Sequence, residues 1–108
     1  MMRVEEASDA KLGIARIIRY LVDADAVHAA ERFIDALSET SELLARFPKI
    51  GPVAESTRNR RIPIRHIQLY RHADWLILYQ VHSESVLILR ILHASQDIES
   101  ALNPRSDS

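Results

Sequence analysis

The spacing of apolar residues changes halfway along this chain, and the change limits the folds that it can adopt. Between residues 8 and 46, apolar side chains recur every three or four positions, which is the period of an amphipathic helix. From residue 62 onward, they form short runs rich in β-branched and aromatic residues, which are typical of strands. A helical half followed by a strand-forming half indicates an α+β domain.

Two helices are predicted in the first half, over residues 8–22 and 26–46. Ser8 is a candidate N-cap of the first helix, and Asp25 of the second. The apolar stripe of the second helix consists of Ala30, Phe33, Ile34, Leu37, Ser41, Leu44 and Phe47. The segment FPKIGP ends this helix, because proline cannot continue a helix and glycine permits a turn. Helices joined by so short a connection form an antiparallel hairpin.

Three strands are predicted in the second half, over residues 62–70, 75–81 and 85–92. The alternation of the first strand slips in phase, which predicts a bulge near Arg65–His66. Residues 71–74 are a predicted turn. The last two strands are almost continuously apolar, so they need cover on both faces.

The predicted fold is therefore an α-helical hairpin packed on one face of a small twisted antiparallel β-sheet of three to four strands. Residues 2–6 are a possible short first strand, and residues 96–102 a short C-terminal helix. We expect a single domain over residues 1–103 and a flexible tail over residues 104–108.

Several classes of protein are disfavoured by composition. Cysteine is absent, so there is no disulfide and no thiolate nucleophile. The five histidines lack the helical i, i+4 spacing of common zinc sites, and we expect neither a metal nor a cofactor. The N-terminal residues lack the apolar core of a signal peptide, and no apolar run approaches the roughly 18 residues of a membrane span. A cytoplasmic protein without a membrane partner is expected.

Basic charge is concentrated in one segment of a chain whose net charge is -1. Residues 56–73 carry no acid and five arginines, whereas both flanking regions are acidic. These arginines are Arg58, Arg60, Arg61, Arg65 and Arg71. They could bind an acidic partner, whether a protein segment or a phosphate backbone. Equally, they could protect a solvated edge strand against aggregation.

Arg90 interrupts an apolar strand, where an unpaired charge is costly. It either pairs with an acid at a face of the sheet or points into a concave site, and the sequence favours neither. Trp75, Tyr79 and Tyr70 could be platforms on which nucleic-acid bases stack. Trp75, Ile77, Tyr79 and Val81 alternate along one strand face, however, which favours packing in the core or at an interface.

The polar residues that end the last strand suggest a hydrolase at first sight. His93, Ser95 and Asp97 lie within five positions, however, and triad members converge from distant parts of a chain. We expect instead that His93 ends the strand and that Ser95 or Asp97 caps the following helix.

The order of these motifs resembles the ParE/RelE superfamily of bacterial type II toxins. The helical half resembles the family's hairpin at Ile17–Leu21, Ala29–Phe33 and Phe47–Gly51. The strand half resembles its C-terminal motif, matched by Leu78, Tyr79, Val81, Ile88, Arg90, Leu92, His93 and Asp97. The resemblance covers roughly residues 10–100 and is closer to the ParE branch. Gln96 departs from it, since the family usually has an arginine there.

The resemblance implies a toxin that inhibits DNA gyrase by binding and is neutralised by a ParD-like antitoxin. A segment of the antitoxin would then cover the large apolar surface that the last two strands expose on the face away from the helical hairpin. Contact with operator DNA would occur only through the antitoxin complex. Antitoxin or target binding would then involve the five arginines together with Trp75, Tyr79 and Arg90. The alternative is a RelE-like ribosome-dependent mRNA endonuclease, whose candidate catalytic residues would be Arg65, Tyr79, Arg90 and His93. The acidic balance favours the first reading, because a nuclease must approach a dense polyanion. An inert interaction module is a third possibility.

Overall fold

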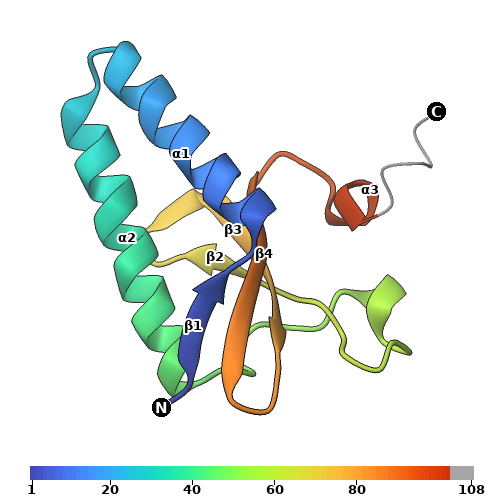
Figure 1. Cartoon of the computed structure of the whole chain (residues 1–108). Helices are drawn as coiled ribbons and strands as arrows, with labels where there is room; N and C mark the ends of the chain where they lie inside the picture. The colour runs from blue at the N-terminus through green and yellow to red at the C-terminus, as the bar shows by residue number, and fades with distance from the viewer. Residues whose placement is uncertain (103–108) are drawn as a thin grey trace.

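A computed structural model describes residues 1–102 and shows two helices followed by three strands, as expected (Figure 1). The elements are β1 (Arg3–Glu6), α1 (Ser8–Asp23), α2 (Val27–Arg46), the 3₁₀ turn η1 (Glu55–Thr57), β2 (Arg65–Leu69), β3 (His72–Val81), β4 (Ser85–His93) and α3 (Ile98–Leu102). The α+β class and the helical hairpin are confirmed. No helix in the described range could cross a membrane. The predicted tail at 104–108 lies outside the described residues.

Both predicted helix caps are wrong by one residue. Ala7 is the N-cap of α1, because its carbonyl accepts the first helical bond, from the Lys11 N–H. Ala26 occupies the same position in α2. Asp25 instead sits in the connection with a φ of 59°, a left-handed conformation that aspartate tolerates better than most residues.

The buried side of α2 differs in part from the predicted stripe. Ala30, Phe33 and Leu44 are buried as expected, but Ile34 is 46% exposed. Ala36 and Thr40 take the inward positions instead. A small alanine and a hydrogen-bonded threonine are easily missed when only large apolar residues are counted.

The sheet has the strand order β1-β4-β3-β2. The three C-terminal strands are antiparallel neighbours, as predicted. β1 pairs in parallel with β4, with Arg3 opposite Ser85, so the complete sheet is mixed. The long connection through both helices permits this parallel pairing, which a short loop could not achieve.

Strand boundaries and irregularities differ from the predictions. β2 begins at Arg65 rather than at residue 62, because Ile62 and Ile64 belong to a loop, from which Ile64 packs against the sheet. The predicted bulge near Arg65–His66 is wrong, since the register of β2 shifts between Gln68 and Leu69. The predicted turn at 71–74 is also displaced: β3 already begins at His72. In β4, Leu89 is an unpredicted bulge residue without a partner opposite it.

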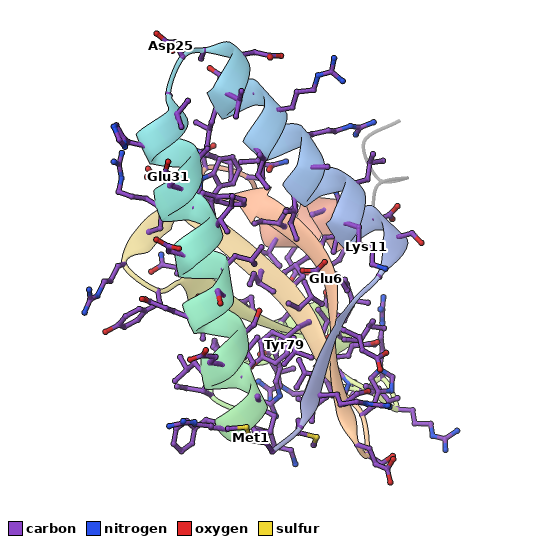
Figure 2. All side chains as sticks on the ribbon, turned by 60° about the vertical axis from the view of Figure 1, so that its left-hand side comes forward. Met1, Glu6, Lys11, Asp25, Glu31 and Tyr79 are labelled. Carbon is purple, nitrogen blue, oxygen red and sulfur yellow. The ribbon has the colours of Figure 1, made fainter. Side chains whose placement is uncertain are left out.

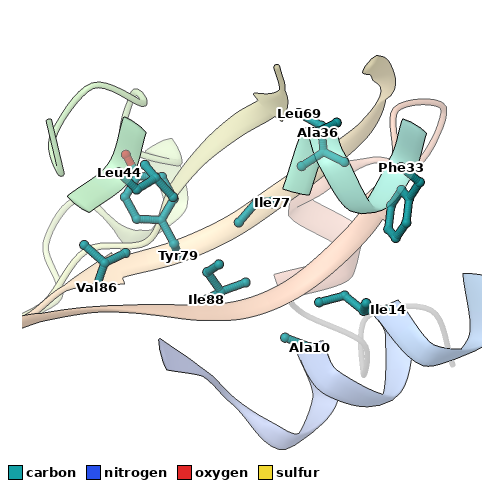
Figure 3. Packing of buried hydrophobic residues seen from close by; sticks show 10 residues of the cluster. All are labelled: Ala10, Ile14, Phe33, Ala36, Leu44, Leu69, Ile77, Tyr79, Val86 and Ile88. Carbon is teal, nitrogen blue, oxygen red and sulfur yellow. The ribbon is translucent and has the colours of Figure 1, made fainter. Parts of the chain in front are cut away.

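Two apolar cores lie on opposite faces of this sheet. The helix-face core packs α1 and α2 against the strands and includes Phe33, Ile77 and Tyr79 (Figure 3). The α3-face core is smaller and consists of Ile64, Leu76, Leu78 and Leu92, with α3 packed against it. The chain therefore covers these leucines itself, and the expectation that β3 and β4 expose a large apolar surface is wrong.

The exposed large apolar side chains lie elsewhere among the described residues. They are Met1, Leu12, Tyr20, Val22, Val27, Ile34, Phe47, Ile50 and Tyr70. Most of them belong to the outer surface of the helices or to the segment that follows α2. These positions are the large apolar side chains that are most accessible to a partner among residues 1–102.

Candidate binding surface and the predicted site residues

Tyr79 lies in the core between α2 and the sheet, with no exposed surface (Figure 2). Its hydroxyl oxygen accepts a 2.9 Å hydrogen bond from the Gly51 N–H. Burial raises the pKa of this phenol above its usual 10.0, and the Gly51 bond and the charge of Arg65 oppose the shift. Tyr79 therefore anchors the segment after α2, and its place in the core does not fit a surface contact role.

Arg65 acts on the same segment from β2. One guanidinium nitrogen, Nη1, donates to the Gly51 carbonyl at 2.8 Å and to the Lys49 carbonyl at 3.3 Å. Gly51 must be a glycine here, because a Cβ would lie 2.3 Å from the His66 carbonyl oxygen. The segment after α2 is thus held by three hydrogen bonds that involve side chains, by the bond from the His66 N–H to the Pro52 carbonyl, and by one close backbone approach.

Arg58, Arg60 and Arg61 lie together in the loop before β2. The Arg58 guanidinium forms a two-pronged pair with Glu55, at 3.0 and 2.8 Å. This pairing lowers the pKa of the Glu55 carboxyl. Arg60 and Arg61 are exposed and form no ion pair within residues 1–102.

The loop that carries these arginines is itself well ordered by Thr57. This buried hydroxyl donates to the Ala54 carbonyl at 2.8 Å and accepts from the Ile64 N–H at 2.9 Å. The two free guanidinium groups are therefore presented on a fixed loop.

Arg71 lies at the opposite end of β2, in the connection to β3. It has a φ of 59°, which costs a residue with a side chain about 1 kcal/mol. Its guanidinium carbon is 5.1 Å from the centre of the Tyr70 ring. The five arginines thus do not form one site: three precede β2, Arg65 points into the protein, and Arg71 contacts a tyrosine at the other end.

Of the two arrangements predicted for Arg90, pairing with an acid does not occur among residues 1–102, and the concave site stays a prediction. Arg90 lies opposite Leu78 on the α3 face of the sheet, and its Nη1 donates to the Ala101 carbonyl at 3.1 Å. Its described contact is therefore with the last turn of α3, where a carbonyl has no partner inside the helix.

Trp75 and His93 are neighbours across β3 and β4. Trp75 packs edge-to-face on Phe33, at 5.8 Å between ring centres, and His93 packs edge-to-face on Trp75 at 5.2 Å. The predicted packing role of Trp75 is confirmed. The His93 Nδ1 lies 2.7 Å from the Ser95 Oγ and 3.2 Å from the Ser95 backbone nitrogen, so the polar contacts of the ring are with the turn that follows β4.

The polar residues after β4 form a turn and a helix cap. His93 is the last residue of β4, and Asp97 accepts from the Glu99 N–H at 3.3 Å and from the Ser100 hydroxyl at 3.0 Å. Asp97 therefore caps α3, which confirms the structural interpretation of this segment. The Gln96 side-chain oxygen accepts the His93 N–H at 2.8 Å. An arginine could not replace that contact, because its side chain has no acceptor.

The four candidate catalytic residues do not converge. Arg65 and Tyr79 face the helices at one end of β3, whereas Arg90 is on the opposite face of the sheet. His93 pairs with Trp75, four residues from Tyr79 along β3, a separation of about 13 Å. Within residues 1–102 there is also no group of three potential metal ligands.

A surface groove beside α2 was not predicted from the sequence. Its lining residues are Glu39, Glu42, Leu43, Arg46, Phe47 and Tyr70, and its volume is about 300 Å³. The only sequence signal is indirect: Phe47 and Tyr70 are large apolar residues next to predicted breaks, where burial is hard to judge.

Known proteins resemble this chain both in sequence and in fold. Residues 5–98 match the family described as the ParE toxin of the type II toxin-antitoxin system parDE. A solved structure of a chromosomal ParDE toxin-antitoxin system from P. aeruginosa is similar, with a TM-score of 0.68 and 19% sequence identity. The similarity covers 88% of this chain and 98% of that one, and at this identity it shows the fold. No curated protein sequence matches. Because the family match spans most of the chain, this protein belongs to the ParE toxin family of type II toxin-antitoxin systems.

Proposed function

We propose that this ParE-family toxin inhibits DNA gyrase by binding, and that a ParD-like antitoxin neutralises it. One observation carries the choice of binding over catalysis. The groups that could catalyse RNA cleavage are each engaged in a structural contact, and they lie on two faces of the sheet. Cleavage would require a base, an acid and phosphate-binding cations around one point.

The exposed loop before β2 is the part of the predicted site that best suits contact with an acidic partner. Arg60 and Arg61 lie on a loop that the hydrogen bonds of Thr57 hold in place, so little conformational entropy of the loop is lost on binding. Charge at the rim of an interface mainly raises the association rate. The double substitution Arg60→Glu, Arg61→Glu should therefore slow association with gyrase or the antitoxin by about tenfold, with a smaller change in dissociation.

Induced expression with three readouts tests the proposal. A reporter of DNA damage should respond within one generation, cells should become filamentous, and ribosome-bound mRNA should stay intact. Co-expression of the antitoxin encoded beside the toxin should restore growth. Rapid mRNA cleavage with intact DNA would instead indicate a RelE-like nuclease, and no effect on growth would indicate an inert interaction module.

A further inference from the structure

The α3 face of the sheet is covered by the loop before β2 and by α3, and the loop is the firmly attached part (Figure 1). The Ala54 N–H donates to the Ile64 carbonyl at 2.8 Å, and the Thr57 hydroxyl bridges the same two residues. Gln80 of β3 donates from its Nε2 to the Ile62 carbonyl at 3.1 Å. These bonds close the loop on itself and tie it to the sheet.

α3, in contrast, is attached to the sheet at one point. Among residues 1–102, its hydrogen bond to a strand is the one that the Ala101 carbonyl accepts from Arg90 Nη1. Asp97 binds the Glu99 N–H and the Ser100 hydroxyl, so the cap is internal to α3 and moves with it. Departure of α3 would break one hydrogen bond and would leave the ladder between β3 and β4 intact.

Apolar contacts add little to this attachment. None of the five residues of α3 is fully buried, and the core beneath is touched by the partly buried Ile98, Ala101 and Leu102. Docking fixes the backbone of all five residues, which costs conformational entropy, and so short a helix has no stability of its own. The gain from three partly buried side chains is therefore largely offset, and the docked and undocked forms differ little in free energy.

Arg90 also holds α3 only weakly. Its guanidinium lies at the last turn of the helix, where the partial charge of the carbonyls is negative. No acid among residues 1–102 strengthens this contact with an ion pair. When α3 leaves, both the guanidinium and the carbonyl can bind water instead, so the net loss is small.

The apolar face beneath α3 keeps its shape without α3. Leu76 lies opposite Leu92 in the ladder between β3 and β4, and Leu78 lies opposite Arg90. Ile64, the fourth member of this core, is held by its hydrogen bond to Thr57. The sheet and the loop therefore keep these side chains in place, and departure of α3 exposes a preformed surface instead of unfolding the protein.

We propose that α3 is a lid that opens as a unit while the rest of the protein stays folded. The closed lid hides Ile64, Leu76, Leu78 and Leu92, a surface that would favour association if it were permanently exposed. The open lid exposes this surface and frees the Arg90 guanidinium beside it. The open form should make up roughly 0.1–10% of the molecules. The lid goes beyond the proposed function and does not depend on the target of the toxin.

Thiol labelling measures the opening directly, because the chain has no cysteine of its own. Ile77 and Leu78 are neighbours in β3 and are 0% and 1% exposed, but Ile77 belongs to the helix-face core and Leu78 to the α3-face core. The thiol of Leu78→Cys should react with an aromatic disulfide reagent at about 10⁻³–10⁻¹ of the rate in the urea-unfolded protein. Ile77→Cys is the matched control and should react at least about 100-fold more slowly, because the helix-face core opens only on global unfolding.

The dependence on urea separates local from global opening. Low concentrations of urea should hardly change the labelling rate of Leu78→Cys, because opening of α3 exposes little surface, whereas the rate of Ile77→Cys should rise steeply. Equal rates with equal dependence on urea would show that the two faces open only together and would overturn the lid. A Leu78→Cys thiol that reacts as fast as in the unfolded protein would show a face that is never covered, which also overturns it.

A second pair of variants covers the case in which one of these proteins does not fold, as judged by circular dichroism. Leu92→Cys and Ile88→Cys place the thiol in the same two cores from β4, at positions that are 1% and 0% exposed. The same difference in rate and in urea dependence is expected for this pair, and its absence would overturn the lid.

Substitution of the helix cap, in the Leu78→Cys background, tests whether α3 is the element that moves. Asp97 is exposed, and Asp97→Ala should accelerate labelling about 3- to 10-fold because it removes the cap. Asp97→Asn, which caps a helix equally well, should leave the rate near that of Leu78→Cys alone. Neither substitution should change the labelling of Ile77→Cys. An unchanged rate in Asp97→Ala would assign the opening to the loop before β2 and overturn α3 as the lid.

Discussion

The two faces of the sheet are built very differently. The helix face is covered by two long helices, and its core extends from Ile14 on α1 to Val86 on β4. The α3 face is covered by one loop and a five-residue helix around four buried residues. A helix of five residues is not stable by itself, so α3 depends on Arg90, on its Asp97 cap and on the leucines beneath it. We infer that the helix face carries most of the stability.

The largest effect is expected from a truncation in the helix-face core. Phe33 is fully buried and packs against Trp75 and His72. Phe33→Ala should lower the free energy of unfolding by about 3–5 kcal/mol, because it removes a large apolar side chain and leaves a cavity. Urea denaturation followed by circular dichroism measures this change. A loss below about 1 kcal/mol would contradict the inference that the helix face contributes most of the stability.

The matching truncation on the α3 face should cost less. Leu92 is only 1% exposed, so its burial equals that of the leading helix-face residues. Leu92→Ala should nevertheless lower the free energy of unfolding by only about 2–3 kcal/mol, near the low end for a buried leucine. The loop and the short helix that cover this face can move and partly fill the cavity. Equal losses for Phe33→Ala and Leu92→Ala, after correction for side-chain size, would remove the distinction between the faces.

Removal of one hydroxyl tests the polar anchor within the helix face. Tyr79→Phe leaves the Gly51 N–H without its partner and should cost about 1–3 kcal/mol at neutral pH. Folding raises the pKa of Tyr79, because burial favours the neutral phenol. The neutral phenol therefore contributes its full share to the free energy of unfolding below the usual phenol pKa of 10.0. This contribution is lost as the pH rises through the higher pKa of the folded state. Wild-type stability should therefore fall above pH 10, and the fall should be shallower in Tyr79→Phe.

The order of the elements could be predicted from the sequence, because it follows from hydrophobic period alone. The periods of residues 8–46 and of the last two strands are long and regular, and both resulted in the predicted elements. Boundaries were less predictable where a connection is apolar. Ile62 and Ile64 were assigned to a strand, but Ile64 packs on the α3 face from a loop.

The site could be predicted only in part, because sequence position does not reveal where a polar side chain is used. Arg65 and Arg60 look alike in the sequence, yet one binds carbonyls inside the protein and the other is exposed. The Thr40 hydroxyl accepts the N–H of Tyr70, thirty residues away. The Gln96 side-chain oxygen accepts the His93 N–H and so reinforces a turn that the Gln96 N–H already closes on the His93 carbonyl. Contacts of this kind appear only when the chain is folded.

The smallest effect is expected at His93. Its ring is exposed, and its contacts are to Ser95 and Trp75 at the end of β4. His93→Ala should cost about 1 kcal/mol or less, and toxicity should persist. A nuclease that used His93 for proton transfer would instead lose about 10²–10⁴ in rate. Growth arrest after matched expression of the two proteins, together with thermal unfolding, distinguishes these outcomes.

The central claim, that this toxin acts by binding rather than by catalysis, is tested most directly by a supercoiling assay with purified gyrase. We predict that the wild type inhibits supercoiling in proportion to the ratio of toxin to gyrase, that His93→Ala inhibits equally, and that the antitoxin reverses both. Gyrase that remains fully active at a large excess of toxin, while substoichiometric toxin cleaves ribosome-bound mRNA and His93→Ala does not, would contradict the claim.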